Sequence, residues 1–227
     1  MTAETGLVAF DFVEKLSKLR FTDVFNPYAD ICSKYDKPDA AVIRKRNLHL
    51  VIDAALSKGI DSMWFARDLG YRGGRRTGLA LTDEVHLVWH AQLLSTPPLI
   101  RATKGTAMSE RTATTVWDAL QLINRPIFLW NVFPLHPHEP NDQMTNRCHK
   151  KVERKAFQKL NSWLIETLKP KQVIAIGRDA QCSIDELGIK PVKIRHPSYG
   201  GKAEFLEGLS NTYGISLDSE PYQGSLF

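Results

Sequence analysis

Asp68, Asn131 and His196 each stand where an apolar run of this chain ends, and all three side-chain types can carry chemistry. A carboxylate such as that of Asp68 can orient water or stabilise a developing cation, although an aspartate more commonly caps a helix or pairs with an arginine. The Asn131 amide can bind the edge of a base or simply tie loops together. His196 precedes Pro197, which favours an extended backbone, and a single histidine is more often structural than catalytic. Each residue alone is therefore a weak signal.

The elements that must position these side chains follow from the alternation of apolar runs with amphipathic segments. Apolar runs predict strands at residues 62–66, 127–131, 172–177 and 192–194. Amphipathic segments predict helices at about residues 39–56, 112–122, 147–168, 179–187 and 203–213. Short apolar strands separated by helices are typical of a parallel sheet that is buried on both faces. We therefore expect a three-layer α/β/α fold around a central, mainly parallel four-stranded sheet.

In such a sheet the carboxyl ends of the strands share one edge, and binding sites lie beyond it. Asp68, Asn131 and His196 all follow strand ends, so they are expected to meet there. Residues 1–215 show no obvious internal repeat and are expected to form a single domain. Residues 216–227 are polar and lack a helical pattern, which predicts a flexible C-terminal tail.

The charge of the chain indicates a polyanionic partner. Its 227 residues carry a net charge of +5, and the sequence pI is about 9.1. One arginine cluster lies in a glycine-containing stretch around Asp68, and we expect phosphate contacts from its members Arg67, Arg72, Arg75 and Arg76. A second basic cluster at residues 44–46, which begins with Arg44, is interpreted as a solvated face.

Several classes of protein and site are disfavoured. No apolar run is long enough to span a membrane, and the first residues lack the features of a secretory signal, so we expect a cytoplasmic protein without membrane contact. The scattered Cys32, Cys148 and Cys182 fit no disulfide framework and no zinc or iron–sulfur spacing, and they are expected to be reduced and mostly buried. His136 and His138 lie among prolines and are interpreted as an ordinary surface loop. No metal and no other cofactor is predicted.

Four motifs in the expected order, together with a segment that follows the first of them, resemble those of the uracil-DNA glycosylase superfamily, over about residues 62–201. The family's G-Q-D-P-Y-H is similar to A-R-D-L-G-Y at residues 66–71, and its H-G-L-C-F-S is similar to T-G-L-A-L-T at residues 77–82. Its L-L-L-N strand is similar to F-L-W-N at residues 128–131, and its W-G-x-x-A-Q to I-G-R-D-A-Q at residues 176–181. Its H-P-S motif recurs at residues 196–198. The chain resembles a divergent bacterial or phage-defence-like branch without an iron–sulfur cluster.

The resemblance implies a DNA glycosylase, which flips a base out of DNA and hydrolyses its N-glycosidic bond to leave an abasic site. Asp68 would correspond to the residue that orients water and stabilises the cationic sugar. His196 would correspond to the donor that stabilises the departing base, and Asn131 to the residue that binds the flipped base. Contacts with DNA are implied for the arginine-rich loop and for Thr77, Ser198 and Tyr199.

Two departures from the family leave the identity of the base open. Gly70 aligns with the tyrosine that blocks bases bulky at C5, and Leu81 aligns with the stacking phenylalanine, so we expect a base pocket that is open near C5. The target would be an aberrant or modified pyrimidine, either uracil or a 5-substituted pyrimidine. An alternative is anti-phage defence by excision of hypermodified cytosine, such as glucosylated hydroxymethylcytosine. Asn131 can serve either base because its amide both donates and accepts.

Two other classes of protein stay open as alternatives. A catalytically inactive DNA-binding module would have the same fold, but the presence of Asp68, Asn131 and His196 favours an enzyme. A small-molecule α/β enzyme that binds nucleotides would carry a glycine signature, which the glycines at residues 70, 73 and 74 do not form. We therefore expect DNA as the partner, bound by a monomer.

The last five residues, Q-G-S-L-F, resemble the Q-L-S-L-F peptide by which bacterial proteins bind the replication sliding clamp. Four of the five positions match, and Gly224 stands at the second. The alternative is a tail that happens to end in two apolar residues. The sequence thus predicts a clamp contact through Gln223, Leu226 and Phe227.

Overall fold

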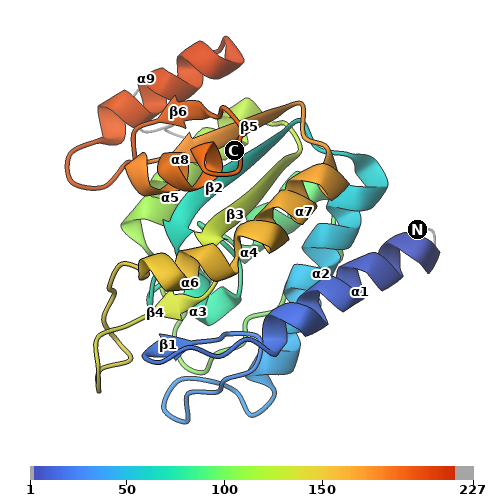
Figure 1. Cartoon of the computed structure of the whole chain (residues 1–227), viewed down its shortest axis with the longest axis vertical. Coiled ribbons are helices and arrows are strands. Elements are labelled where there is room, and N and C mark those ends of the chain that lie inside the picture. The colour runs from blue at the N-terminus through green and yellow to red at the C-terminus, as the bar shows by residue number, and fades with distance from the viewer. Residues whose placement is uncertain (1–2, 218–227) are drawn as a thin grey trace, which may run out of the picture.

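The computed structural model describes residues 3–217, with side chains from residue 8 onward. Its centre is a sheet formed by β2 (Ser62–Asp68), β3 (Ile127–Phe133), β5 (Gln172–Ile176) and β6 (Val192–Ile194). Neighbouring strands run parallel in the order β3-β2-β5-β6 (Figure 1), which confirms the predicted fold class. β2 and β3 are longer than predicted, so Asp68 is the last residue of β2 and Asn131 lies inside β3.

Helices cover both faces of the sheet, because successive strand residues point to opposite sides. On β3, Phe128 and Trp130 belong to one apolar cluster, whereas Ile127 and Leu129 belong to another. The first cluster includes residues of α1 (Ala3–Ser17), α2 (Ala40–Lys58), α7 (Gln158–Leu168) and α8 (Arg178–Asp185). The second includes residues of α5 (Arg111–Ile123) and α9 (Lys202–Tyr213) (Figure 1). A core on each side of the sheet gives the three-layer arrangement.

Several short elements of the structure were not predicted. They are α3 (Gly74–Thr77), α4 (Leu87–Leu94) and an antiparallel pair of β1 (Val24–Phe25) with β4 (His136–Pro137). β1, β4 and α3 have two to four residues, which is too short to show a periodic pattern, whereas α4 has eight residues. The predicted helix at residues 147–168 is two helices, α6 (Lys151–Ala156) and α7, which separate at Phe157. Phe157 is fully buried and packs edge-on against Phe133, with ring centroids 5.1 Å apart.

The interpretation of the second basic cluster as a solvated face is wrong for Arg44. Its side chain is fully buried and pairs with Asp36 at 2.5 Å. Its Nε donates to the backbone carbonyl of Arg76 at 3.0 Å. Because a buried guanidinium needs partners for its donors, these bonds make Arg44 a link between α2 and the α3 turn.

Two further interpretations are corrected by burial. His136 and His138 are buried in and next to β4, where the pairing with β1 covers them, so this segment is no ordinary surface loop. The cysteines are less buried than expected. Cys148 is exposed, and Cys32 and Cys182 are half-buried.

Buried histidines make the stability of the fold depend on pH. Burial lowers the pKa of His90 to about 3, and burial is the main cause that lowers the pKa of His136 to about 3. In the unfolded chain both rings take up protons near their ordinary pKa of 6.5. Below that pH the unfolded state binds more protons than the folded state, so the free energy of unfolding falls as the pH drops towards 3.

We expect the two histidines together to remove roughly 3 kcal/mol of stability per pH unit once the pH is below their unfolded pKa. Urea unfolding at pH 7 and pH 5 measures this difference. His90→Gln removes one of the titrating groups and should make the dependence shallower. Equal free energies of unfolding at the two pH values would contradict the burial argument.

Candidate active site

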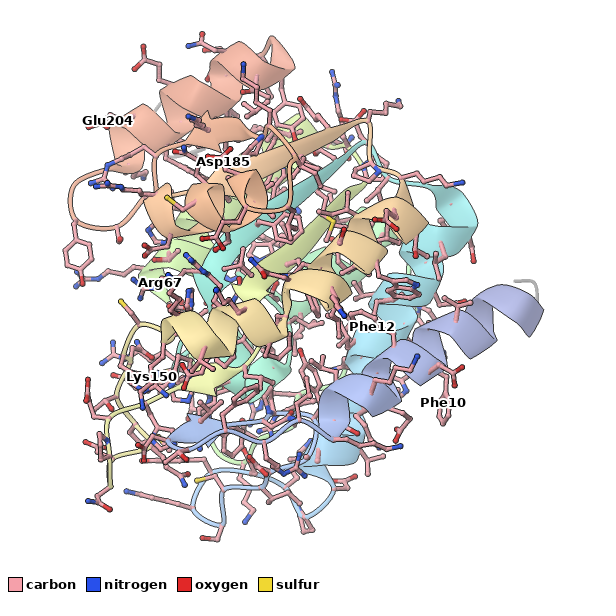
Figure 2. The ribbon with its side chains drawn as sticks, in the orientation of Figure 1. Phe10, Phe12, Arg67, Lys150, Asp185 and Glu204 are labelled. Atoms are coloured by element: carbon pink, nitrogen blue, oxygen red, sulfur yellow. The ribbon has the colours of Figure 1, made fainter. Side chains whose placement is uncertain are left out.

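A cleft of about 490 Å³ opens at the carboxyl edge of the sheet. The ends of β2 and β5 and the loop that follows β6 line it, as expected for a parallel sheet. Figure 2 shows Arg67 at this edge, between α6 and α8. The predicted site residues that the structure brings to the cleft are Arg67, Asp68, Gly70, Leu81, His196, Ser198 and Tyr199.

Both carboxylate oxygens of Asp68 accept a hydrogen bond. Nε of Arg67 donates to Oδ2 at 2.6 Å, and Nδ1 of His149 donates to Oδ1. The Asp68 side chain is only 5% exposed, so these two donors fix its direction. Each carboxylate oxygen keeps a further lone pair, which leaves Asp68 able to accept a hydrogen bond from water in the cleft.

His149 and Asn146 are site residues that the sequence analysis missed. They belong to the segment between β4 and α6, which Arg147 holds in place. Its guanidinium pairs with Glu153 at 2.7 Å and donates to the backbone carbonyl of His138 at 3.0 Å. The helix predicted from about residue 147 includes His149, whereas α6 begins at Lys151. No motif marks this loop, so only the residue types themselves were a signal.

The hydrogen bonds of His196 determine which ring nitrogen carries the proton. The backbone N–H of Ser198 points to Nδ1 at 3.1 Å, and because an amide N–H only donates, Nδ1 is the acceptor. The Ser198 hydroxyl lies 2.7 Å from the same nitrogen and donates as well. The neutral ring therefore carries its proton on Nε2. Gly177 allows this packing, since a Cβ there would stand 3.3 Å from the Cβ of His196.

The surroundings of His196 keep the ring neutral. Burial, followed by the positive charges of Arg67 and Arg195, lowers its pKa to about 4. At neutral pH the residue is thus an uncharged donor in a cleft that four arginines also line. Such a donor can stabilise an oxygen that becomes negative during a reaction.

Asn131 lies beneath the cleft and is not part of its lining. It pairs in register with Ala66 of β2, and Ala66 does line the cleft. The Asn131 side chain is buried, and its Oδ1 has no hydrogen-bond partner among residues 8–217. An unsatisfied buried acceptor costs about 1–3 kcal/mol. A donor from a bound molecule would remove this penalty.

Leu81 and Glu110 line the cleft together with Gly70. Leu81 has a φ of +52°, a backbone conformation that residues other than glycine rarely adopt. Glu110, which the sequence analysis also missed, precedes α5 and donates its backbone N–H to Asp83 at 2.6 Å. Burial and the negative charge of Asp83 raise the pKa of the Glu110 carboxyl, and Arg72 opposes them.

Arg75, Arg76 and Thr77, predicted to contact DNA, are buried and are not part of the cleft lining. The Arg75 guanidinium lies 3.8 Å from the centre of the Phe25 ring. Arg76 pairs with Glu84 at 3.0 Å, and the Thr77 hydroxyl donates to a backbone carbonyl five residues later at 2.7 Å. These side chains hold the α3 turn together and do not reach the cleft.

Other cationic side chains surround the mouth of the cleft. Arg67, Arg178 and Arg195 line it, and Arg72 is exposed nearby. The side chains of Arg67 and Arg195 are 40% and 47% exposed, so they can meet a ligand from solvent. Tyr199 is 98% exposed on the same rim. A basic rim with one exposed aromatic ring suits a phosphate backbone that carries bases.

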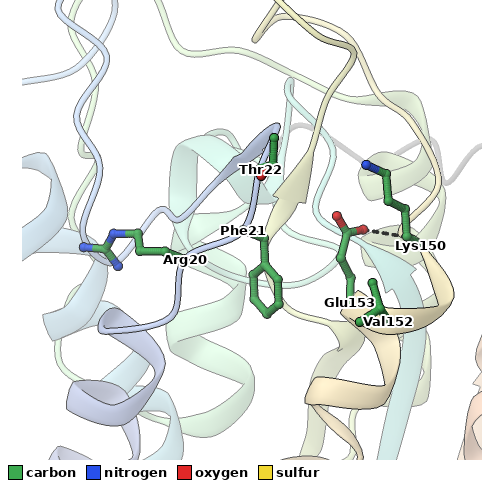
Figure 3. Close-up of a pocket in the computed structure, with 6 residues that line it drawn as sticks. All are labelled: Arg20, Phe21, Thr22, Lys150, Val152 and Glu153. Carbon is green, nitrogen blue, oxygen red and sulfur yellow. Dashed lines mark hydrogen bonds between the residues drawn. The ribbon is translucent and has the colours of Figure 1, made fainter.

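A second cavity, of about 550 Å³, has none of these residues in its lining (Figure 3). Its lining consists of Arg20, Phe21, Thr22, Lys150, Val152 and Glu153. Glu153 is the one acidic residue among them, and it already accepts the backbone N–H of Lys150 at 2.5 Å and two bonds from Arg147. Glu153 therefore has a structural role, because these bonds occupy its carboxylate.

Between residues 3 and 217 no group of three His, Cys, Asp or Glu side chains is arranged to hold a metal ion. Within the same range no helix has the length and apolar character needed to cross a membrane.

Neither protein-family models nor curated protein sequences match this chain. Among solved structures, the crystal structure of wild-type SMUG2 from Pedobacter heparinus is similar, with a TM-score of 0.60. The two chains are 14% identical, and the match covers 91% of this chain and 97% of that one. At this identity the likeness establishes a shared fold, and the roles of individual residues have to be argued from the cleft.

Proposed function

We propose that this protein is a DNA glycosylase that flips an aberrant or modified pyrimidine, uracil or a 5-substituted pyrimidine, out of DNA and hydrolyses its N-glycosidic bond. The observation that carries the proposal is the meeting of Asp68 and a neutral His196 in one cleft, next to Asn131, whose buried amide oxygen is unpaired and whose register partner Ala66 lines the cleft. This reaction needs a carboxylate, a neutral donor and a group that binds the base. The fold shared with SMUG2, a member of the uracil-DNA glycosylase family, supports the same reaction class.

On the side of the base, bond cleavage leaves the electron pair on the pyrimidine, whose O2 becomes negative. In this proposal Nε2–H of His196 donates to O2 and stabilises the departing anion. A neutral ring suits this role because Nδ1 is already occupied by the two donors of Ser198. Asn131 Oδ1 accepts a hydrogen bond from a ring N–H or an exocyclic amino group and so orients the base.

On the side of the sugar, cleavage leaves an oxocarbenium cation. The Asp68 carboxylate stabilises this cation and accepts a hydrogen bond from the water that attacks C1′. The water gives its hydroxyl to C1′, and its proton passes through Asp68 to solvent. Arg67 and His149 keep the carboxylate pointed in one direction during these steps.

DNA would bind across the rim of the cleft. Arg67, Arg178 and Arg195, which line the cleft, would contact phosphates of the bound strand. Tyr199, which is almost fully exposed, would enter the space that the base leaves in the stack. Ser198 lies against the His196 ring, so its hydroxyl positions the histidine in this arrangement.

The proposal is tested with single-stranded and duplex oligonucleotides that carry one uracil or one 5-substituted pyrimidine, followed by alkaline cleavage at abasic sites. Strand cleavage with at least one substrate is the expected result. Salt-sensitive binding without cleavage of any substrate would favour an inactive DNA-binding module instead. Absence of both binding and cleavage would favour a small-molecule enzyme.

We also propose that the tail binds the sliding clamp, through Gln223, Leu226 and Phe227, which lie outside the described residues. Each apolar side chain can contribute roughly 1.5–3 kcal/mol when buried in a groove, before the cost of ordering the tail. Deleting residues 223–227 should abolish clamp binding in a calorimetric titration while turnover on short oligonucleotides stays the same. An intact protein without clamp affinity at high micromolar concentration would contradict this.

A further inference from the structure

Two hollows other than the cleft adjoin the start of α6. The first, of about 280 Å³, is lined by Lys151 and Arg154 together with Arg67. The second is the cavity of Figure 3, to which Lys150 and Glu153 belong. Because residues three apart share a helix face, the two pairs lie on different faces of this turn. The neighbouring residues Lys150 and Lys151 therefore line two different hollows.

The hollow at Lys151 adjoins the cleft, since Arg67 and Asp179 line both. Figure 2 shows Arg67 between α6 and α8, the helices that border this hollow. A strand bound in the cleft can therefore pass Arg67, enter the hollow and cross the start of α6 to Lys150. We call the surface formed by Arg67, Lys151 and Lys150 the α6 track.

Both acids of the hollow are already paired with arginines. Glu186 pairs with Arg154 at 2.6 Å, and Asp179 pairs with Arg67 at 3.4 Å. Lys151 is exposed and forms no ion pair within the described part of the chain, so no acid matches its charge. The buried Nε of Arg154 also has no hydrogen-bond partner there. The hollow thus offers donors that an anion can satisfy.

The cavity at Lys150 has the same arrangement of charges. Glu153 is held by Arg147 at 2.7 Å, whereas Lys150 is exposed and its ammonium group forms no ion pair among residues 8–217. Phe21 and Val152, the latter 69% exposed, give this cavity an apolar part. A cation beside an apolar surface suits a nucleotide, which has an anionic phosphate and a base with apolar faces.

We infer that the α6 track binds the DNA strand that leaves the cleft, with backbone phosphates at Lys151 and Lys150. This inference rests on the proposed function and extends its DNA contact from the rim of the cleft to the start of α6. A run of lysines without adjoining hollows is usually a solvated face. Here both lysines lack an acidic partner, and each lines a space on the path from the cleft. A phosphate would supply the missing anion.

The salt dependence of DNA binding tests the two lysines. Affinity is measured at several salt concentrations, with the full chain and single-stranded oligonucleotides that carry one tetrahydrofuran abasic analogue. The analogue fixes the register of the strand without presuming which base is excised. A lysine that neutralises one phosphate contributes about 0.7 to the slope of log affinity against log salt concentration. Lys150→Ala and Lys151→Ala should therefore each bind more weakly and reduce the magnitude of this slope by about 0.7.

Lys190→Ala is the matched control. Lys190 is exposed and precedes β6, so it lies at the opposite edge of the sheet from the cleft. The substitution removes the same charge and should change neither the affinity nor the slope. All three lysines are exposed, so each variant should keep the melting temperature of the wild type.

Neutral methylphosphonates locate the phosphates that the α6 track binds. Each phosphate on either side of the abasic analogue is replaced in turn, and the affinities of the wild type and the lysine variants are compared. We expect replacement at neighbouring positions on one side to weaken binding by the wild type. The same replacements should have little further effect in Lys150→Ala or Lys151→Ala, because the partner of that phosphate is already absent.

The outcomes separate the α6 track from the proposed function. Coupling between a lysine and particular phosphates supports the track, even if no base is released from any substrate, in which case the glycosylase proposal fails alone. Additive losses at every position, or lysine variants that bind like Lys190→Ala, overturn the track. Base release together with either of these last results leaves the glycosylase proposal standing.

Discussion

His196→Ala is expected to release base about 100- to 1,000-fold more slowly than the wild-type protein, because it loses the donor that stabilises the departing anion. The residue lines the cleft, and the two donors of Ser198 leave Nε2 as the protonated nitrogen. Single-turnover kinetics on the best substrate measure the chemical step. Affinity for DNA, measured in parallel with an uncleavable substrate, should change little.

The pH profile gives an independent check on His196. Because its pKa is lowered to about 4, the ring stays neutral at pH 5 and above, and protonation of this group should not produce a break in the rate near pH 6.5. The rate should fall only as the pH drops towards 4, where a proton on Nδ1 would oppose the N–H of Ser198. A wild-type rate in His196→Ala, or a break near pH 6.5 that this variant lacks, would remove the neutral donor from the mechanism.

Asp68→Asn is expected to slow base release by about 100- to 10,000-fold, the range associated with a positioned acid or base. The amide has nearly the same shape, but it lacks the negative charge that stabilises the cationic sugar and accepts the proton of water. Its substrate affinity should remain close to that of the wild type.

Two companion variants show whether the effect belongs to Asp68. Asp179→Asn removes another carboxylate that contacts Arg67, at 3.4 Å, and because its side chain is 55% exposed the rate should change little. His149→Ala removes one hydrogen bond to Asp68 and should cost about 10- to 100-fold in the rate of the chemical step. Equal losses in Asp68→Asn and Asp179→Asn would indicate a general charge effect and contradict the assigned role.

The sequence was sufficient to predict the sheet and its edge. The apolar runs of β2, β3 and β5 contribute residues to the clusters on both faces of the sheet, so they contain a clear strand signal, whereas only Ile194 of β6 is buried. Because the carboxyl ends of parallel strands lie at the same edge of the sheet, the parallel order then brings Asp68 and His196 together. Asn131 was predicted to end a strand at the edge of the sheet. Because β3 continues for two residues beyond the predicted end, Asn131 lies inside the strand and outside the lining of the cleft.

Contacts between distant segments could not be predicted. His149 lies 81 residues from Asp68, and the pairing of the two depends on how Arg147 fixes an irregular loop. An arginine cluster in the sequence also does not reveal which members are solvated. Arg67 reaches the cleft, whereas Arg76 turns inward to Glu84, a partner that only the folded chain provides.

The most direct test of the central claim is mass spectrometry of the products from duplex DNA that contains a single modified or aberrant pyrimidine. We predict that the wild-type protein yields the free base and an equal amount of DNA with an abasic site, and that His196→Ala and Asp68→Asn yield neither on the same time scale. Release of a nucleoside or nucleotide, or free base from both variants at the wild-type rate, would show that this cleft does not break the N-glycosidic bond.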